Sequence, residues 1–282
     1  MSYTSKYCYV VFLIISMFSC SDSGHMIKMK GSDTEVNLAV NLSEQFAEEN
    51  PDFSIAISGG GSGLGITSLL NGQADIANSS RPLSEDEKRL FQQKSIQLKT
   101  VVFAEDATAF VVNTNNPLNE VSIQQLASLL NGKYSNWTAV SAENLPVSIY
   151  GRQSSSGTYS FVKKKLHIDY SPSAKEMTGN AQILEAIKVD KSGIGYVGAG
   201  YISKNASKNH GIKVLKVKAN DSSESVSPLD SKAIQQRRYF FQRPLYQFIP
   251  TSSWEKVKPF IQYETKGKGR IIIENSGYYL IN

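Results

Sequence analysis

The chain is poor in the residues that build metal centres and disulfides. Its 282 residues include two cysteines, Cys8 and Cys20, and three histidines. Both cysteines lie near the N-terminus, so we expect no disulfide and no cysteine-based zinc site in the folded part. The histidines, at positions 25, 167 and 210, do not have the spacing of metal ligands. We therefore expect neither metal nor cofactor, and we expect burial of a large core to supply the stability.

Motifs of nucleotide and nucleophilic chemistry are also missing. No Gly-x-x-x-x-Gly-Lys-Ser/Thr string occurs, which argues against a nucleotide P-loop. The glycine-rich run 59–65 fails the dinucleotide-binding spacing, because Ile66 stands where the third glycine belongs. It also fails the pattern of a nucleophile elbow around Ser62, because Leu64 replaces the final glycine. No paired carboxylates indicate glycoside chemistry. These absences favour a binding protein over an enzyme.

Long apolar runs are absent too. The apolar run 9–18 is too short to span a bilayer, and it follows one positive charge, Lys6. It ends in Ser19-Cys20, a small residue before a cysteine, as in a bacterial lipoprotein signal. We expect residues 1–19 to be a signal peptide, Cys20 to be lipidated, and residues 20–29 to form a tether and the first strand. An ordinary secretory signal is the alternative. Either reading predicts an exported protein, and lipidation would anchor it at the cell membrane, on the periplasmic face or the cell surface.

A strong charge imbalance is likewise absent. The formal net charge is +5, with 20% charged and 40% hydrophobic residues. The basic clusters 163–165 and 213–218 contain no interleaved aromatic residues and match no nucleic-acid-binding module. We expect these clusters to be solvated surfaces, with no nucleic acid as partner.

The chain does contain alternating strand and helix patterns, which predict an α/β protein. Predicted strands cover residues 26–29, 53–57, 74–77, 101–103, 110–112, 147–150, 194–197, 213–217 and 244–249. Predicted helices cover residues 35–48, 123–130 and 182–189, and others begin near residues 66, 84 and 159. The C-terminal stretch from residue 254 to residue 273 is expected to pack back on the first unit.

Three predicted helices begin at turns rich in glycine and hydroxyl groups: 31–34, 59–65 and 152–158. Free N–H groups and the positive end of the helix dipole make such starts suitable for anions. Only the third turn carries an arginine, Arg152, whose guanidinium fork matches a tetrahedral oxyanion. The hydroxyl groups of Thr34, Ser62, Ser156 and Thr158 can add further donors. The three turns together predict a pocket for one small oxyanion.

Seven strings, in this order, resemble the PstS family of phosphate-binding proteins of bacterial ABC importers: Gly31-Ser32-Asp33-Thr34, Ser58 to Gly63, Asn78 to Leu83, Gly132 to Trp137, Arg152 to Thr158, Gly193 to Val197 and Arg243-Pro244-Leu245-Tyr246. The resemblance implies a two-lobed periplasmic-binding-protein fold of type II. The ligand cleft would lie between lobes joined by two crossing strands, near residues 104–110 and 238–246. Lobe I would comprise residues 30–105 plus 243–282, and lobe II residues 106–242.

The resemblance also implies a set of phosphate contacts. They are Thr34, the backbone of Glu35, Ser62, Arg152, Ser156, Gly157 and Thr158, and we add Ser80 and Arg81 as candidates.

Two positions depart from the family pattern. Ser80 stands where well-known members carry an aspartate that accepts the phosphate proton and repels sulfate. Selectivity would then come from Asp33 or be weaker. Ser154 stands where an acidic partner of Arg152 is expected, which would leave Arg152 freer for the ligand. Beside Ser80, Arg81 either contacts the anion or caps a loop.

The function implied by the resemblance is a high-affinity receptor for inorganic phosphate. It would bind without catalysis, act as a monomer, and deliver the anion to the membrane permease of an ABC importer. Two alternatives stay open. One is a receptor for another oxyanion, sulfate or molybdate. The other is a surface phosphoester hydrolase or an adhesin on the same scaffold; a hydrolase would need a nucleophile with a base in reach.

Overall fold

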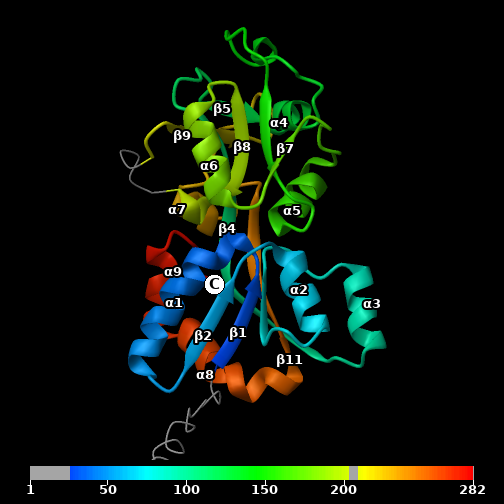
Figure 1. Ribbon diagram of the computed structural model, residues 1–282. Helices are drawn as coiled ribbons and strands as arrows, with labels where there is room; N and C mark the ends of the chain where they lie inside the picture. Colours follow the sequence, from blue (N-terminus) through cyan, green and yellow to red (C-terminus); the bar gives the residue numbers. More distant parts are fainter. Residues whose placement is uncertain (1–25, 203–208, 282) are drawn as a thin grey trace, which may run out of the picture.

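The computed structural model describes residues 26–202 and 209–281, and it has two lobes connected by two long strands (Figure 1). The predicted signal peptide and the predicted lipidation site at Cys20 lie outside the described residues. No helix in the described part of the chain combines the length and the apolar character needed to cross a bilayer.

Lobe I, the lower one in Figure 1, combines the N-terminal and C-terminal parts of the chain. Its strands are β1 (Met26–Gly31), β2 (Ser54–Ser58) and β3 (Ile76–Ser79). The 3-10 turn η2 (Asp33–Glu35) leads into α1 (Val36–Glu49), and α2 (Ser62–Leu70) and α3 (Glu85–Gln93) follow. The C-terminal η6 (Thr251–Ser253), α8 (Trp254–Glu264) and α9 (Gly267–Asn275) complete the lobe. Phe260 of α8 and Ile273 of α9 share a core with Leu38 and Phe46 of α1, so the C-terminal stretch packs on the first unit as predicted.

Lobe II, the upper one, is built from the middle of the chain (Figure 1). Its strands are β5 (Glu120–Ser122), β6 (Ser148–Arg152), β7 (Lys175–Met177), β8 (Gly193–Gly198), β9 (Ile212–Val214) and β10 (Lys216–Lys218). Its helices are α4 (Ile123–Leu130), α5 (Gly157–Leu166), α6 (Asn180–Val189) and α7 (Ser231–Gln235), with short turns η3 (Trp137–Ala139) and η4 (Ala199–Tyr201).

Two strands cross between the lobes: β4 (Leu98–Asn113) and β11 (Gln242–Pro250). They pair antiparallel from Leu98↔Pro250 to Ala107↔Gln242, with a register shift between Leu245 and Tyr246. Both predicted crossing segments lie within this pair or next to it, and the predicted lobe boundaries at residues 105/106 and 242/243 also fall there.

A single nine-stranded sheet runs through both lobes, in the order β2-β1-β3-β11-β4-β8-β6-β7, with β9 also paired to β4. In lobe I, β2, β1 and β3 are parallel, and β11 joins β3 antiparallel. In lobe II, β8, β6 and β7 are parallel. Successive residues of β4 face opposite sides of the sheet, so Phe110 and Val112 enter one core while Ala109 and Val111 enter another. Because the strands within each of these sets run parallel, the loops that follow them lie together at the carboxyl edge of the sheet, where ligands bind in α/β folds.

Some predicted elements differ in extent from those of the structure. The predicted strands 101–103 and 110–112 are one strand, β4, because the polar residues between them are bonded: Asp106 to Arg243, and Glu105 to Arg237 and Gln242. The second glycine-rich turn opens its helix at Ser62 instead of near residue 66. The predicted strand 213–217 is split at residue 215 into β9 and β10, which pair with different strands.

A buried carboxyl group links β11 to the C-terminal helices. Glu264 is completely buried, and its Oε2 accepts a hydrogen bond of 3.1 Å from Nε2 of Gln247. Burial raises the pKa of Glu264 to about 8. The protonated form is therefore favoured in the folded state relative to the unfolded chain.

Replacing Glu264 with glutamine is expected to flatten the pH dependence of stability. The folded-state pKa is raised, so this group's stabilisation is present below the unfolded pKa near 4.5 and is lost as the pH rises to about 8. E264Q removes this titration, so it should raise the melting temperature relative to the native chain more at pH 8 than at pH 5. Thermal unfolding at pH 5, 6.5 and 8 measures the difference, and an equal shift at all three values would contradict the buried-acid account.

Candidate anion-binding site between the lobes

The first wall of the candidate site is the start of α2 in lobe I. Gly60 and Gly61 have φ values of +114° and +110°, a conformation that side chains disfavour, and helix α2 begins directly afterwards at Ser62. A Cβ atom on Gly61 would also lie 2.7 Å from the carbonyl oxygen of Ser155 in lobe II. The glycines therefore let this turn fold and let the opposite lobe approach it.

The second wall is the start of α5 in lobe II, directly after β6. Ser156 is the N-cap, and its Oγ accepts a hydrogen bond from the N–H of Tyr159 at 3.4 Å. Gly157 and Thr158 form the first turn, where N–H groups have no partner within the helix. Both residues are buried at the junction of the lobes.

Arg152 ends β6 and is a buried cation of the site. Its side chain is 2% exposed, and Nη2 donates to the carbonyl oxygen of Thr178 at 3.0 Å. Among the described residues, its Nε has no hydrogen-bond partner, and Nη1 has only an ion pair with Asp33 at 3.3 Å. Burial lowers the pKa of Arg152, and the carboxylate of Asp33 opposes this shift. A buried guanidinium with N–H groups to spare is suited to receive an anion.

The acidic partner of Arg152 corrects a sequence prediction. The serine at position 154 suggested that Arg152 has no carboxylate beside it. Asp33 fills that role from the other lobe, and its Oδ2 also accepts hydrogen bonds from the N–H and the side-chain amide of Asn180, at 2.7 and 2.6 Å. This carboxylate is already bound by three donors, so the selectivity role predicted for Asp33 gains no support here.

The two lobes touch each other at the site. The N–H of Gly63 donates to the carbonyl oxygen of Ser155 at 3.0 Å, and the hydroxyl groups of Thr34 and Thr158 lie 3.0 Å apart. A Cβ atom on Gly157 would lie 2.3 Å from Oγ of Ser62 and 2.5 Å from Oγ of Ser80. Predicted contact residues from both lobes therefore meet at the site, and one pair of them, Thr34 and Thr158, is 124 positions apart in the sequence.

The hydroxyl groups of the site accept hydrogen bonds from N–H groups. Oγ of Ser62 accepts from the N–H of Ser80 at 3.1 Å, and Ser156 accepts from its own helix. Thr34 and Thr158 both accept from Nη2 of Arg243, at 3.3 and 3.0 Å. A hydroxyl group that accepts in this way directs its own hydrogen elsewhere. Ser80 Oγ is buried and, among the described residues, has no hydrogen-bond partner.

Two predicted contact residues, Glu35 and Arg81, form hydrogen bonds within the protein. The N–H of Glu35 donates to the carbonyl oxygen of Ser32 at 3.2 Å, within η2. The side chain of Glu35 is completely buried, which raises its pKa well above the usual range and favours the neutral form. Arg81 forms two hydrogen bonds of 2.7 Å with Glu87 and donates to the carbonyl oxygen of Pro82. These bonds hold the loop before α3, and a contact of Arg81 with the anion stays a prediction.

Sequence reasoning assigned no role to two charged residues of the crossing strands. Arg243 of β11 and Asp106 of β4 are register partners, 3% and 1% exposed, joined by hydrogen bonds of 2.8 and 3.1 Å. Arg243 lies in one of the seven quoted strings, Arg243-Pro244-Leu245-Tyr246. The role of Arg243 could have been found from one signal: an arginine inside a strand that is predicted to cross between the lobes.

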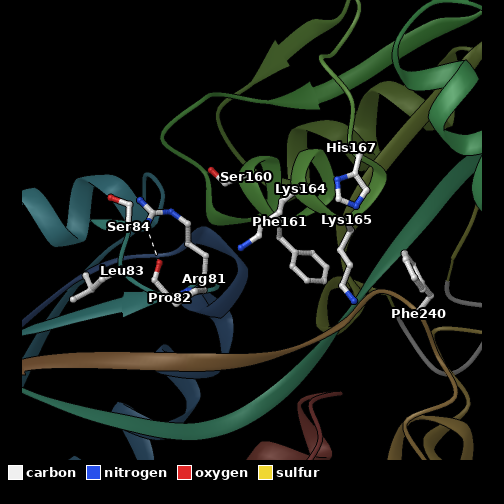
Figure 2. Close-up of a pocket in the computed structure, with 10 residues that line it drawn as sticks. All are labelled: Arg81, Pro82, Leu83, Ser84, Ser160, Phe161, Lys164, Lys165, His167 and Phe240. Carbon is white, nitrogen blue, oxygen red and sulfur yellow. Dashed lines mark hydrogen bonds between the residues drawn. The ribbon is translucent and has the colours of Figure 1, made fainter. Parts of the chain in front are cut away.

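A groove opens beside the site, with a volume of about 750 Å³. Figure 2 shows its lobe I side, from Arg81 to Ser84, and its lobe II side on α5, with Phe161 and Lys164. Phe161 also lies under the guanidinium of Arg243, at 5.1 Å from the ring centre. The described residues contain no group of three His, Cys, Asp or Glu side chains that could hold a metal ion.

Known proteins match the chain over most of its length. The model of the PBP superfamily domain matches residues 21–266. The phosphate-binding protein PstS of Staphylococcus haemolyticus is 28% identical over 258 residues, which are 89% of this chain and 79% of that protein.

Two solved structures share the fold. A Clostridium perfringens substrate-binding protein with bound phosphate has a TM-score of 0.82 and 22% identity, covering 91% of this chain and 100% of the other. An ABC-type phosphate transport receptor from Vibrio cholerae has a TM-score of 0.69 and 25% identity, covering 90% and 100%. The predicted two-lobed α/β fold is thereby confirmed. With the family model spanning most of its residues, the chain belongs to the PBP superfamily, a family of substrate-binding receptors.

Proposed function

We propose that this chain is the phosphate-binding receptor of an ABC importer and that it holds inorganic phosphate between its lobes at the start of α5. The observation that carries the proposal is Arg152, a buried guanidinium whose Nε has no hydrogen-bond partner among the described residues. The relatives named as phosphate-binding proteins and the neighbour with bound phosphate support this ligand.

The other groups of the site fit an oxyanion. The hydroxyl groups of Ser62, Ser156 and Thr158 can donate, and so can the first N–H groups of α5. Burying a small anion is costly unless many donors replace its water. Hydrogen bonds to a charged group contribute about 1.5–3 kcal/mol each, so a few of them reach the roughly −8 kcal/mol of micromolar binding.

The preference for phosphate over sulfate needs a group that accepts the phosphate proton. The carboxylate of Asp33 is bound by Asn180 and Arg152, and that of Asp106 is bound by Arg243. Oγ of Ser80, which is buried without a partner among the described residues, is the acceptor that we propose. Because a serine does not repel sulfate as a carboxylate does, a general oxyanion receptor is the second candidate.

Calorimetric titration of the purified, ligand-stripped protein near pH 7 with phosphate, sulfate and molybdate tests this function. We expect one phosphate per chain, bound with micromolar or higher affinity, and weaker binding of sulfate and molybdate. Equal binding of phosphate and sulfate would establish the general oxyanion receptor. Absence of binding by all three anions would contradict both candidates, and hydrolysis of a chromogenic phosphomonoester would then point to the enzyme alternative.

The cellular setting belongs to the same proposal. We propose that Cys20 carries the lipid, that the receptor is monomeric, and that it works at the cell membrane with the permease subunits of the importer. Opening and closing of the lobes about β4 and β11 would admit and trap the anion, as hinge closure does in such receptors.

A further inference from the structure

We infer that Arg243 is the positioning residue of the binding site: it orients the hydroxyl groups of Thr34 and Thr158 toward the ligand and holds the two lobes together. The inference rests on the proposed phosphate binding for its effect on affinity. Its effect on lobe closure is independent of the ligand.

Arg243 contacts both lobes at the site. In lobe I, its Nη2 donates to Thr34 Oγ1 at 3.3 Å, and its Nη1 donates to the carbonyl oxygen of Ser80 at 3.4 Å. In lobe II, Nη2 donates to Thr158 Oγ1 at 3.0 Å, and the guanidinium lies over the ring of Phe161. A single side chain from a crossing strand therefore bridges the first turns of the two lobes.

These contacts determine which hydrogen-bonding role the hydroxyl groups of Thr34 and Thr158 can take toward a ligand. Nη2 of Arg243 has two hydrogens; one is directed to Asp106, so the two threonine hydroxyls share the other. A guanidinium only donates hydrogen bonds, so each hydroxyl group must use a lone pair to accept from it. The hydrogen of each hydroxyl is then available for another acceptor. The two oxygens are 3.0 Å apart, and one hydrogen can lie between them until an anion supplies better acceptors. Arg243 therefore presets both groups as donors, which favours an anion over a cation or a neutral acceptorless ligand.

Asp106 determines how much charge Arg243 brings to the ligand. Its Oδ2 accepts from Nε and Nη2 of Arg243 at 3.1 and 2.8 Å, and both residues are almost completely buried. The pair is close to neutral from a distance, so Arg243 adds little to the long-range attraction of an anion. Arg243 should instead lower the dissociation rate of the ligand, because the ligand can leave only when the bridged lobes separate.

The decisive variant is Arg243→Lys. Lysine keeps the positive charge beside Asp106, but its single ammonium group cannot span Thr34, Thr158 and Ser80 as the fork does. Stopped-flow measurement with phosphate should show a dissociation rate at least about tenfold higher and an association rate within about twofold of the native value. R238K is the matched control. Arg238 lies just before β11, is exposed, and pairs only loosely with Glu224, at 3.7 Å.

Two further variants separate positioning from simple structural support. D106N removes a negative charge near the site and leaves the bonds from Arg243 to the threonines, so phosphate should bind at least as tightly as in the native protein. T158V removes one of the oriented hydroxyl groups, so adding R243K to it should raise the dissociation rate less than R243K does alone. If D106N increased the dissociation rate as R243K does, the pair would be a structural element and the inference would fail.

A ligand-free measurement keeps the inference testable if phosphate is not the ligand. The N–H of Gly63 donates to Ser155 across the lobes, so its hydrogen exchange reports their separation. R243K should accelerate this exchange without changing that of core amides such as Val111, and R238K should leave both unchanged. Unchanged exchange at Gly63 in R243K would overturn the bridging role. If native protein did not bind phosphate, only the proposed ligand would fail.

Discussion

Replacing Arg152 with methionine is expected to weaken phosphate binding by at least about 100-fold. Methionine approximates the length of the side chain but removes the charge and the Nε–H that, among the described residues, has no hydrogen-bond partner. Removing one partner of a buried, hydrogen-bonded charge pair costs about 3 kcal/mol or more, which is a factor of about 100 in affinity. Calorimetric titration with phosphate near pH 7 measures the change.

Two companion variants make the Arg152 result specific. R152K keeps the charge without the fork, so its affinity should fall between those of the native chain and R152M. R238M applies the same chemical change to an exposed arginine outside the site and should bind like the native protein. Native-like phosphate affinity in a folded R152M protein would remove Arg152 from the site.

Replacing Gly157 with alanine is expected to weaken phosphate binding without lowering the stability of the ligand-free protein. The new methyl group would lie 2.3 Å from Oγ of Ser62 and 2.5 Å from Oγ of Ser80, distances at which either the two serine side chains or the two lobes must move. Contacts from lobe I to the ligand would be lost or lengthened, so we expect phosphate to bind at least about tenfold more weakly.

The stability of the same variant should move in the opposite direction. Gly157 is the first residue of α5 and has an ordinary negative φ, where alanine is favoured over glycine by up to about 1 kcal/mol. The melting temperature without ligand should therefore be equal to or slightly above that of the native protein. A large drop in melting temperature would instead mean that the methyl group disturbs lobe II itself, and tight phosphate binding would contradict the contact between the lobes.

Local signals predicted most elements of the fold. Helix α4 begins and ends where expected, because Ser122 and Gln125 form a capping box and the helix stops at Asn131. The turns that open α2 and α5 were visible as glycine- and hydroxyl-rich strings before helical patterns. The boundary between the glycine run and α2 was harder to predict. It is set by the positive φ angles of Gly60 and Gly61, which the sequence pattern does not show.

Long-range charge pairs could not be predicted in the same way. Asp33 and Arg152 pair across the two lobes, and Asp106 and Arg243 are 137 positions apart. Nothing local to Asp33 indicates that it neutralises Arg152, and nothing local to Asp106 indicates a paired carboxylate inside a strand. The polar residues between the predicted strand segments 101–103 and 110–112 have their partners in β11 and in the loop before it, which no local pattern shows.

A crystal structure of the protein grown with phosphate tests the central claim most directly. We predict one phosphate between the lobes, within hydrogen-bonding distance of Arg152 Nε, Ser80 Oγ and the first N–H groups of α5. Thr34 and Thr158 should both donate to it while remaining bonded to Arg243. Phosphate found only in the groove beside Lys164, or no phosphate between the lobes, would contradict the account.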